Sequence, residues 1–183
     1  TGHKAICTTN FADPTIADGS TAMNATTYTG NGSTQAVTGL NHSPDFAWIK
    51  HRGRSQSHVI YDIVRGAGTG KSLSSNTAGT EGGAGDGTVY GYLSAFGSDG
   101  FTVIDGSDAE DYVNKSGASY IAWTFDGGTS TVSNTDGSIT SNVRANTSAG
   151  FSIVGYTGTG TAATIGHGLN AAPEFIIVKN RDT

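Results

Sequence analysis

One segment of this chain occurs twice. Residues 39–52 read GLNHSPDFAWIKHR, and residues 168–181 read GLNAAPEFIIVKNR. The approach to each copy also matches, because residues 28–33 read YTGNGS and residues 156–161 read YTGTGT. Glycines, a proline, an apolar stretch and a basic end recur in the same order. A match of this length indicates tandem copies of one domain-sized module.

The repeated unit combines a turn with a strand. Gly39 and Asn41 are residue types that tolerate a positive φ angle, and Pro44 favours an extended conformation for the residue before it. After the proline, residues 46–49 are apolar at every position. The unit therefore predicts a strand that is buried on both faces, as in the core of a sandwich.

The rest of the chain is typical of short strands joined by many turns. Glycine accounts for 28 of the 183 residues, and only 14% of the residues are charged. Apolar residues do not recur at helical spacing over more than about one turn. The hydrophobic content of 35% is low but sufficient for a flat core between two layers. We predict an all-β fold, an antiparallel sandwich of about seven to ten strands rather than a closed barrel.

Apolar runs bounded by turn residues mark the expected strands. They cover residues 25–28, 46–49, 58–64, 88–96, 101–104, 119–125 and 151–156. The glycines at 30 and 32 indicate a hairpin turn after the first strand. Residues 66–87 are rich in glycine and are expected to form a long surface loop, and loops of that length are usually functional or mobile.

The repeat also sets the expected domain boundaries. Residues 1–23 are interpreted as the end of a preceding domain with its linker, and residues 24–127 as the first complete sandwich module. Residues 128–149 are rich in serine, threonine and asparagine and are expected to form a linker. Residues 150–183 would begin a second module that is truncated. We expect the chain to be a segment of a longer, repetitive protein.

Bulk properties argue against several classes of function. A formal net charge of −5 and a pI near 5.3 do not suit a general nucleic-acid binder, which needs a basic surface. Insertion into a membrane is not expected, since no apolar run approaches the roughly 20 residues of a spanning helix. Cys7 is the single cysteine, so an internal disulfide framework is excluded.

Residues 65–72 nearly match the phosphate-binding loop of nucleotide-binding proteins. That motif needs a glycine where Arg65 stands, and it needs a following helix whose N-terminus faces the phosphates. Residues 72–77 are a poor helix sequence. A plain glycine-rich loop is the preferred interpretation.

The sequence contains candidate ligands for two kinds of metal site, calcium and zinc. Asp105, Asp108, Glu110 and Asp111 crowd one polar loop, whose oxygen atoms could hold calcium. Their spacing does not fit an EF-hand, and a solvated acidic loop is the preferred interpretation. Zinc is not expected, because no histidines have the short spacing of a zinc motif and Cys7 has no cysteine partner.

No catalytic motif stands out in the sequence. A Gly-x-Ser-x-Gly elbow is absent, and neither a nucleophile beside a base nor a pair of facing carboxylates can be located. We expect a protein that is not an enzyme and that needs no cofactor. A polysaccharide-degrading enzyme is kept as an alternative because of the long loops.

Aromatic and polar side chains on the loops of a sandwich are what a sugar-binding surface uses. A ring stacks on the apolar face of a pyranose, while asparagine, aspartate and arginine bond its hydroxyl groups. The candidates for such a ligand site are Arg52, Arg54, Asp62, Tyr90, Tyr92 and Tyr112. For each residue alone, the structural interpretation as a half-buried tyrosine or a solvated charge is the stronger one.

Several motifs resemble a module that is repeated in tail-fibre and other virion appendage proteins of bacteriophages, especially cyanophages and marine phages. The matching motifs lie at residues 28–35, 39–50, 61–66, 73–76, 96–101, 120–123, 134–141 and 151–154. Residues 4–10 are similar to the end of a SPRY-like domain that precedes this module in such proteins. The resemblance covers nearly the whole chain, although residues 65–71 are longer than the corresponding link.

The resemblance implies a concanavalin-like or jelly-roll sandwich in a fibrous, trimeric homo-oligomer with other virion proteins as partners. It implies a location on the tail or surface of the virion, outside the cell. The loops would face the host surface, where a polysaccharide is the expected ligand. The alternative within this class is a capsid decoration or baseplate protein. The family brings no catalytic motif with it.

Overall fold

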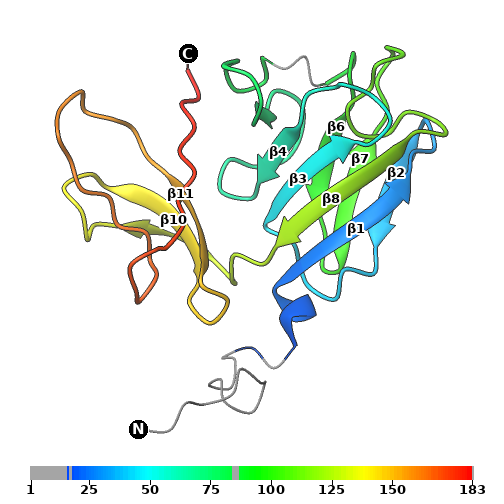
Figure 1. Ribbon diagram of the computed structural model, residues 1–183. Coiled ribbons are helices and arrows are strands. Elements are labelled where there is room, and N and C mark those ends of the chain that lie inside the picture. The colour runs from blue at the N-terminus through cyan, green and yellow to red at the C-terminus, as the bar shows by residue number, and fades with distance from the viewer. Residues whose placement is uncertain (1–15, 17, 84–86, 183) are drawn as a thin grey trace, which may run out of the picture.

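The computed structural model describes residues 16, 18–83 and 87–182 of the chain (Figure 1). The predicted end of a preceding domain, residues 1–15 in particular, lies outside the described residues. A 3₁₀-helix, η2 (Gly19–Thr21), comes first, and the Asp18 carboxylate caps it by accepting a hydrogen bond from the Ser20 amide at 2.9 Å. Among the described residues there is no helix of the length and hydrophobicity needed to cross a bilayer.

The larger of two facing sheets contains five antiparallel strands in the order β1-β8-β3-β4-β5. They are β1 (Met23–Thr29), β8 (Ser119–Phe125), β3 (Phe46–His51), β4 (Val59–Asp62) and β5 (Leu73–Ser74). The strand of the repeated unit, β3, lies in the centre, where Trp48 pairs with Trp123 of β8 and with Ile60 of β4. The predicted strand at 46–49 is therefore confirmed.

The second sheet contains three antiparallel strands in the order β2-β7-β6. They are β2 (Thr34–Thr38), β7 (Gly100–Ile104) and β6 (Tyr92–Phe96). It lies behind the five-stranded sheet in Figure 1, so that the two sheets form the layers of a sandwich. The prediction of an all-β, antiparallel sandwich is confirmed, whereas the concanavalin-like or jelly-roll topology and the tandem arrangement stay predictions.

The core lies between these two sheets and is built mainly from the inward faces of their strands, with Leu40 and Val113 added from the connections. Its buried members are Val37, Leu40, Ala47, Ile49, Val59, Tyr61, Leu93, Phe101, Val103, Val113, Tyr120 and Ala122. Tyr28 of β1 is stacked on Tyr120 at 5.2 Å between ring centroids and donates its hydroxyl to the Val113 carbonyl at 2.7 Å. Strict alternation in β3 and β8 places alanine, isoleucine and tyrosine in this core and turns the larger aromatic residues to the opposite face.

The turn at residues 30–32 does not close a hairpin, which corrects the prediction. β1 pairs with β8 and β2 pairs with β7, so the turn carries the chain from one sheet to the other. Tertiary contacts hold it there, because the Gly30 amide donates to the Ala118 carbonyl at 2.8 Å and the Asn31 amide donates to Asn114 Oδ1 at 3.1 Å. Glycine and asparagine indicate a turn, but they do not state which strands the turn connects.

Gly30 is expected to tolerate no side chain. A Cβ atom at this position would lie 2.3 Å from the Lys115 carbonyl oxygen, a backbone atom that cannot swing away. We expect Gly30→Ala to lower the free energy of unfolding by about 1–3 kcal/mol, as overpacking does. Gly158→Ala is the control, since nothing lies within 4 Å of its added Cβ. Urea denaturation checks this, and equal midpoints for the two variants would contradict the close approach.

A third sheet follows the sandwich and has the order β11-β10-β9. Its strands are β9 (Thr131–Asn134), β10 (Ser141–Asn146) and β11 (Phe151–Gly155), drawn in yellow and orange in Figure 1. The segment predicted as a linker, residues 128–149, thus forms two strands. Few apolar residues mark them: Val143 of β10 is buried, but Val132 of β9 is 53% exposed, and the buried Ile139 lies between the two strands. This weak pattern explains why the sequence did not indicate strands here.

The two copies of the repeated segment do not share one environment. Tyr28 packs in the sandwich core, whereas its counterpart Tyr156 is 39% exposed. Phe46–His51 form the central strand β3, whereas residues 175–178 are outside any strand and are between 59% and 81% exposed. A central strand needs a neighbour on each side, and β3 has β8 and β4. Among the described residues, the second copy has no such neighbours.

His51 makes the stability of the sandwich depend on pH. It is 5% exposed, and its Nδ1 atom accepts a hydrogen bond from the Gly53 amide at 3.0 Å, so the ring is held neutral. Burial, together with the positive charges of Lys50 and Arg54, holds the pKa of His51 below its usual value. The unfolded chain takes up this proton first, so stability is lost as the pH falls below about 6.5.

We therefore expect the free energy of unfolding to fall between pH 7.5 and pH 5, and to fall less in His51→Gln. Urea denaturation at the two pH values measures the difference. Part of the dependence should persist in the variant, because burial and Lys50 also lower the pKa of His58. An identical pH dependence in both proteins would contradict this role of His51.

Candidate functional site

Three of the predicted ligand-binding residues gather at one end of the sandwich. The rings of Tyr90 and Tyr112 are stacked with centroids 4.8 Å apart and planes 17° apart. Arg54 reaches the same loops, since its Nη1 atom donates to the Ala109 carbonyl at 3.3 Å. We call Arg54, Tyr90 and Tyr112 the loop-tip cluster.

Backbone contacts between loops position the cluster. The Tyr112 amide donates to the Tyr90 carbonyl at 2.9 Å, which brings the two tyrosines together from separate loops. Lys50, at the end of β3, donates to the Arg54 carbonyl at 2.7 Å and fixes the loop that carries this arginine. Burial, the neighbouring Tyr90 ring and the charge of Glu110 raise the pKa of the Tyr112 hydroxyl, so it is a hydrogen-bond donor at neutral pH.

The loop-tip cluster has the chemistry of a weak sugar site. Tyr90 and Tyr112 are half-buried and Arg54 is exposed, so parts of the rings and the guanidinium face solvent. Arg52 is exposed in the same loop as Arg54, and its amide donates to the Ser119 carbonyl at 2.8 Å. An aromatic ring can stack on the apolar face of a pyranose, and an arginine with its five donors can bind the hydroxyl groups.

The other two candidates, Asp62 and Tyr92, do not belong to this cluster, which corrects the predicted set. Asp62 is 6% exposed, and its Oδ2 atom lies 2.6 Å from Arg65 Nε in a buried ion pair. Tyr92 is on β6, where it is half-buried and packs against the core. Tyr92 is thus the half-buried strand residue of the structural interpretation, whereas Asp62 is a buried, ion-paired carboxylate and not a solvated charge.

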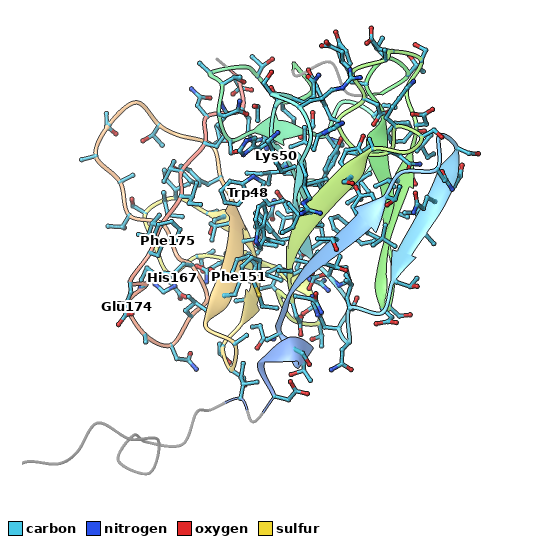
Figure 2. All side chains as sticks on the ribbon, turned by 45° about the vertical axis from the view of Figure 1, so that its right-hand side comes forward. Trp48, Lys50, Phe151, His167, Glu174 and Phe175 are labelled. Carbon is cyan, nitrogen blue, oxygen red and sulfur yellow. The ribbon has the colours of Figure 1, made fainter. Side chains whose placement is uncertain are left out.

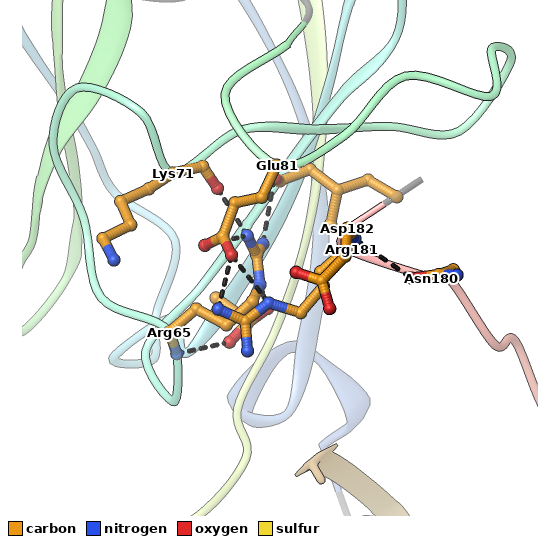
Figure 3. Close-up of polar contacts among 8 residues, drawn as sticks. Arg65, Lys71, Glu81, Asn180, Arg181 and Asp182 are labelled. Carbon is orange, nitrogen blue, oxygen red and sulfur yellow. Dashed lines mark hydrogen bonds and ion pairs between the residues drawn. The ribbon is translucent and has the colours of Figure 1, made fainter. Parts of the chain in front are cut away.

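The glycine-rich loop that resembles a phosphate-binding loop is built around Arg65 instead of a phosphate. The Arg65 side chain is 6% exposed and donates to Asp62, to the Lys71 carbonyl and to Glu81, whose Oε1 atom lies 3.3 Å from Nη1 (Figure 3). β5 follows the loop, in the place where the motif would need a helix. The residue that departs from the motif is thus the one that organises the loop.

Glu81 also joins this loop to the C-terminal segment. Its Oε2 atom accepts a hydrogen bond from Arg181 Nε at 2.6 Å, and its amide donates to the Arg181 carbonyl at 2.8 Å. Lys179 Nζ donates to the Thr77 carbonyl at 2.9 Å nearby. Figure 3 shows Arg65 and Arg181 on either side of Glu81. We call Arg65, Glu81 and Arg181 the glutamate clamp.

The acidic loop does not assemble a calcium site. Asp111 is fully buried, and its oxygens accept backbone hydrogen bonds from Gly106, Val113 and Asn114 at 2.5, 2.6 and 2.5 Å. Asp108 caps the turn by accepting from the Glu110 amide at 2.8 Å. No group of three or more histidine, cysteine or acidic residues among the described residues could hold a metal ion. Asp111 folds the loop, and the four acidic residues do not converge.

A further set of contacts joins the sandwich to the third sheet. Asp45, directly before β3, is 2% exposed, and its Oδ1 atom lies 2.8 Å from Arg144 Nη2 of β10. Its Oδ2 atom accepts from the Gly127 amide at 2.9 Å. Burial raises the pKa of Asp45, while Arg144 and the Gly127 amide act in the opposite direction. The Arg144 guanidinium therefore helps to keep this buried carboxylate ionised.

An aromatic stack lies beside this ion pair. Phe151 of β11 is stacked on Phe125 of β8 at 4.7 Å between centroids and meets the Phe46 ring edge-on at 5.8 Å. In Figure 2, Phe151 and Trp48 lie in this region between the sandwich and the third sheet. We call Asp45, Phe46 and Phe125 on one side, with Arg144 and Phe151 on the other, the junction.

The sequence did not indicate the junction. Phe46 and Phe125 were expected in strands, but the alternation alone does not say what covers their outer face. One signal was available in the repeated unit, which places an acidic residue directly before its apolar strand in both copies, Asp45 and Glu174. An acidic residue beside a buried strand needs a partner, and here the partner is Arg144, 99 positions later in the chain.

A comparison with known protein families gives a match over residues 18–183 to the family described as a domain of unknown function, DUF7483. The chain belongs to this family. The DUF7483 match runs through the sandwich, the junction and the third sheet. No curated protein and no solved structure matches the chain.

Proposed function

We propose that this DUF7483 chain is a structural module of a bacteriophage virion appendage, a tail fibre or adhesin, in which it acts as a rigid spacer. The resemblance of its repeated motifs supports the assignment to a virion. The observation that carries the spacer role is the junction, where the buried Asp45–Arg144 pair and the Phe151 stack fix the third sheet on the sandwich. A fibre that transmits its orientation over a distance needs such fixed contacts between successive units.

The loop-tip cluster supports a second part of the proposal, the recognition of host-surface glycans. Its stacked tyrosines and Arg54 lie on loops at one end of the sandwich, where a long assembly can present them. A shallow site of this kind binds one sugar weakly. Many copies in a fibre, assembled as a homo-oligomer, would bind a polysaccharide tightly through multivalency.

Immunogold electron microscopy of virions, with antibodies raised against this chain, tests the location. Label along a tail fibre or at its tip is the expected result. Label over the capsid lattice or the baseplate would overturn the assignment to a virion appendage and favour a capsid decoration or baseplate protein instead.

Glycan binding is tested separately with the chain displayed as tetramers on streptavidin, so that weak sites are detected. We expect binding to a polysaccharide of the host surface, and we expect Arg54→Ala and Tyr90→Ala each to weaken it by about fivefold or more. Ser98→Ala is the control, because Ser98 is exposed in the β6–β7 turn. Binding that is unchanged in both loop-tip variants would remove the cluster from the proposal.

A further inference from the structure

A hollow of about 300 Å³ lies where the sandwich meets the third sheet and the C-terminal segment. The sandwich contributes Arg65, and the C-terminal part contributes Thr140, Asn142, Tyr156, Thr157 and Arg181. The volume is at the lower end of the range of about 300–1,000 Å³ that is typical of pockets for small ligands. Because both sides supply walls, the hollow exists only while the two parts are docked.

The charges around the hollow are balanced within the protein. Arg65 is paired with Asp62 and Glu81, and Arg181 is paired with Glu81. Two cationic groups are thus matched by two carboxylates at contact distance. An anionic ligand would have to compete with these carboxylates for the arginines, so the hollow favours a ligand without net charge.

Neutral hydrogen-bonding groups line the rest of the hollow. Within the described part of the chain, the side chains of Thr140, Asn142, Tyr156 and Thr157 make no hydrogen bond to another residue, and all four are exposed. The Tyr156 ring is 39% exposed, unlike that of its counterpart Tyr28, which is packed in the core. Hydroxyl and amide groups that both donate and accept, beside an open aromatic ring, match the two kinds of surface on a pyranose.

We propose that this hollow beside the glutamate clamp binds a neutral saccharide, with Tyr156 against its apolar face and Asn142, Thr140 and Thr157 on its hydroxyl groups. The site is separate from the loop-tip cluster. The proposed saccharide site adds to the proposed function that the glycan is uncharged. Its biological meaning rests on that proposed function. Single-site binding is in the millimolar range, as expected for a shallow, wet site, and gains strength from repetition.

Nuclear magnetic resonance titration of the ¹⁵N-labelled chain tests the site directly. The probes are glucose, galactose and N-acetylglucosamine, with N-acetylneuraminic acid as the anionic comparison. We expect at least one neutral sugar to shift the amide signals of residues 140–142 and 155–157, and the anionic sugar to shift them less. No shift of these signals with any neutral sugar up to about 50 mM, or a stronger response to the anionic sugar, would overturn the proposal.

Variants connect the shifts to the named side chains. Tyr156→Ala and, separately, Asn142→Ala are expected to weaken the binding by about tenfold, and both exposed positions leave the fold intact as judged by the remaining amide signals. Ser98→Ala, at an exposed position in the β6–β7 turn, should leave the shifts of residues 140–142 and 155–157 unchanged. Unaltered binding in both Tyr156→Ala and Asn142→Ala would overturn the assignment of the site.

The same titration separates this inference from the proposed function. Shifts confined to the loop-tip cluster would leave glycan recognition in place and reject the site in the hollow. Shifts confined to residues around the hollow that disappear in Tyr156→Ala would establish the site in the hollow and reject recognition by the loop tips.

Discussion

Asp111→Ala is expected to lower the free energy of unfolding by about 3 kcal/mol or more. The substitution leaves the backbone amides of Gly106, Val113 and Asn114 without their acceptor, and each buried unsatisfied donor costs about 1–3 kcal/mol. Burial raises the pKa of the Asp111 carboxyl, which means that burying its charge is itself unfavourable. Removal of the carboxylate therefore offsets part of the loss from the unsatisfied amides. Urea denaturation, with the slope compared between variants, measures the difference.

Glu110→Ala is the matched control for this prediction. Glu110 is exposed in the same loop, so its replacement should change the free energy of unfolding by no more than about 0.5 kcal/mol. Equal losses in the two variants would contradict the role assigned to Asp111. Destabilisation of the unmodified protein by EDTA would also contradict this role of Asp111, because that result would indicate that the loop folds around calcium.

Arg144→Met is expected to release the third sheet from the sandwich. The variant leaves Asp45 buried without its cation, and breaking a buried pair in this way costs about 3–5 kcal/mol unless the parts separate and water reaches the carboxylate. Separation is the cheaper outcome, because the contacts that remain, such as the Phe151 stack, the glutamate clamp and the Lys179–Thr77 hydrogen bond, do not compensate a buried charge without a partner. Small-angle X-ray scattering should show a larger radius of gyration than for the unmodified protein.

Arg181→Met provides the comparison on the same interface. The Arg181 side chain is 43% exposed, whereas that of Arg144 is 16% exposed, so solvent screens the Arg181–Glu81 pair and its loss should cost about 1 kcal/mol or less. The defect of Arg144→Met should also shrink as the pH falls, because the unpaired Asp45 then takes up a proton. A larger effect for Arg181→Met than for Arg144→Met would contradict this description of the junction.

The sequence predicted the sandwich from local patterns and missed the features that depend on long-range contacts. The strands at β3, β7 and β8 follow from alternating or continuous apolar runs with turn residues at their ends. The face that each strand buries was harder, since the large residues Trp48 and Trp123 point away from the core and the smaller Ala47 and Ala122 point into it. Side-chain size alone would place the two tryptophans in the core and the two alanines on the outer face.

The candidate site was predicted in part. Arg54, Tyr90 and Tyr112 were chosen for their chemistry, and the fold brings them together. Asp62 was predicted on the same grounds, but its carboxylate forms an ion pair with Arg65, three positions later in the chain. Sequence spacing cannot show whether a charged side chain faces solvent or folds back onto a neighbour. The junction could not be derived, because its ion pair joins Asp45 to Arg144, 99 positions later in the chain, and only the fold brings them into contact.

The central claim, a rigid connection between the sandwich and the third sheet, is tested most directly by one distance distribution. Spin labels at Ser98→Cys and Thr135→Cys, both exposed, would report it in a protein in which Cys7 is replaced by serine. Pulsed electron spin resonance should give one narrow peak, which broadens in Arg144→Met. A broad or multiple distribution in the protein with Arg144 intact would contradict the rigid junction and, with it, the spacer role.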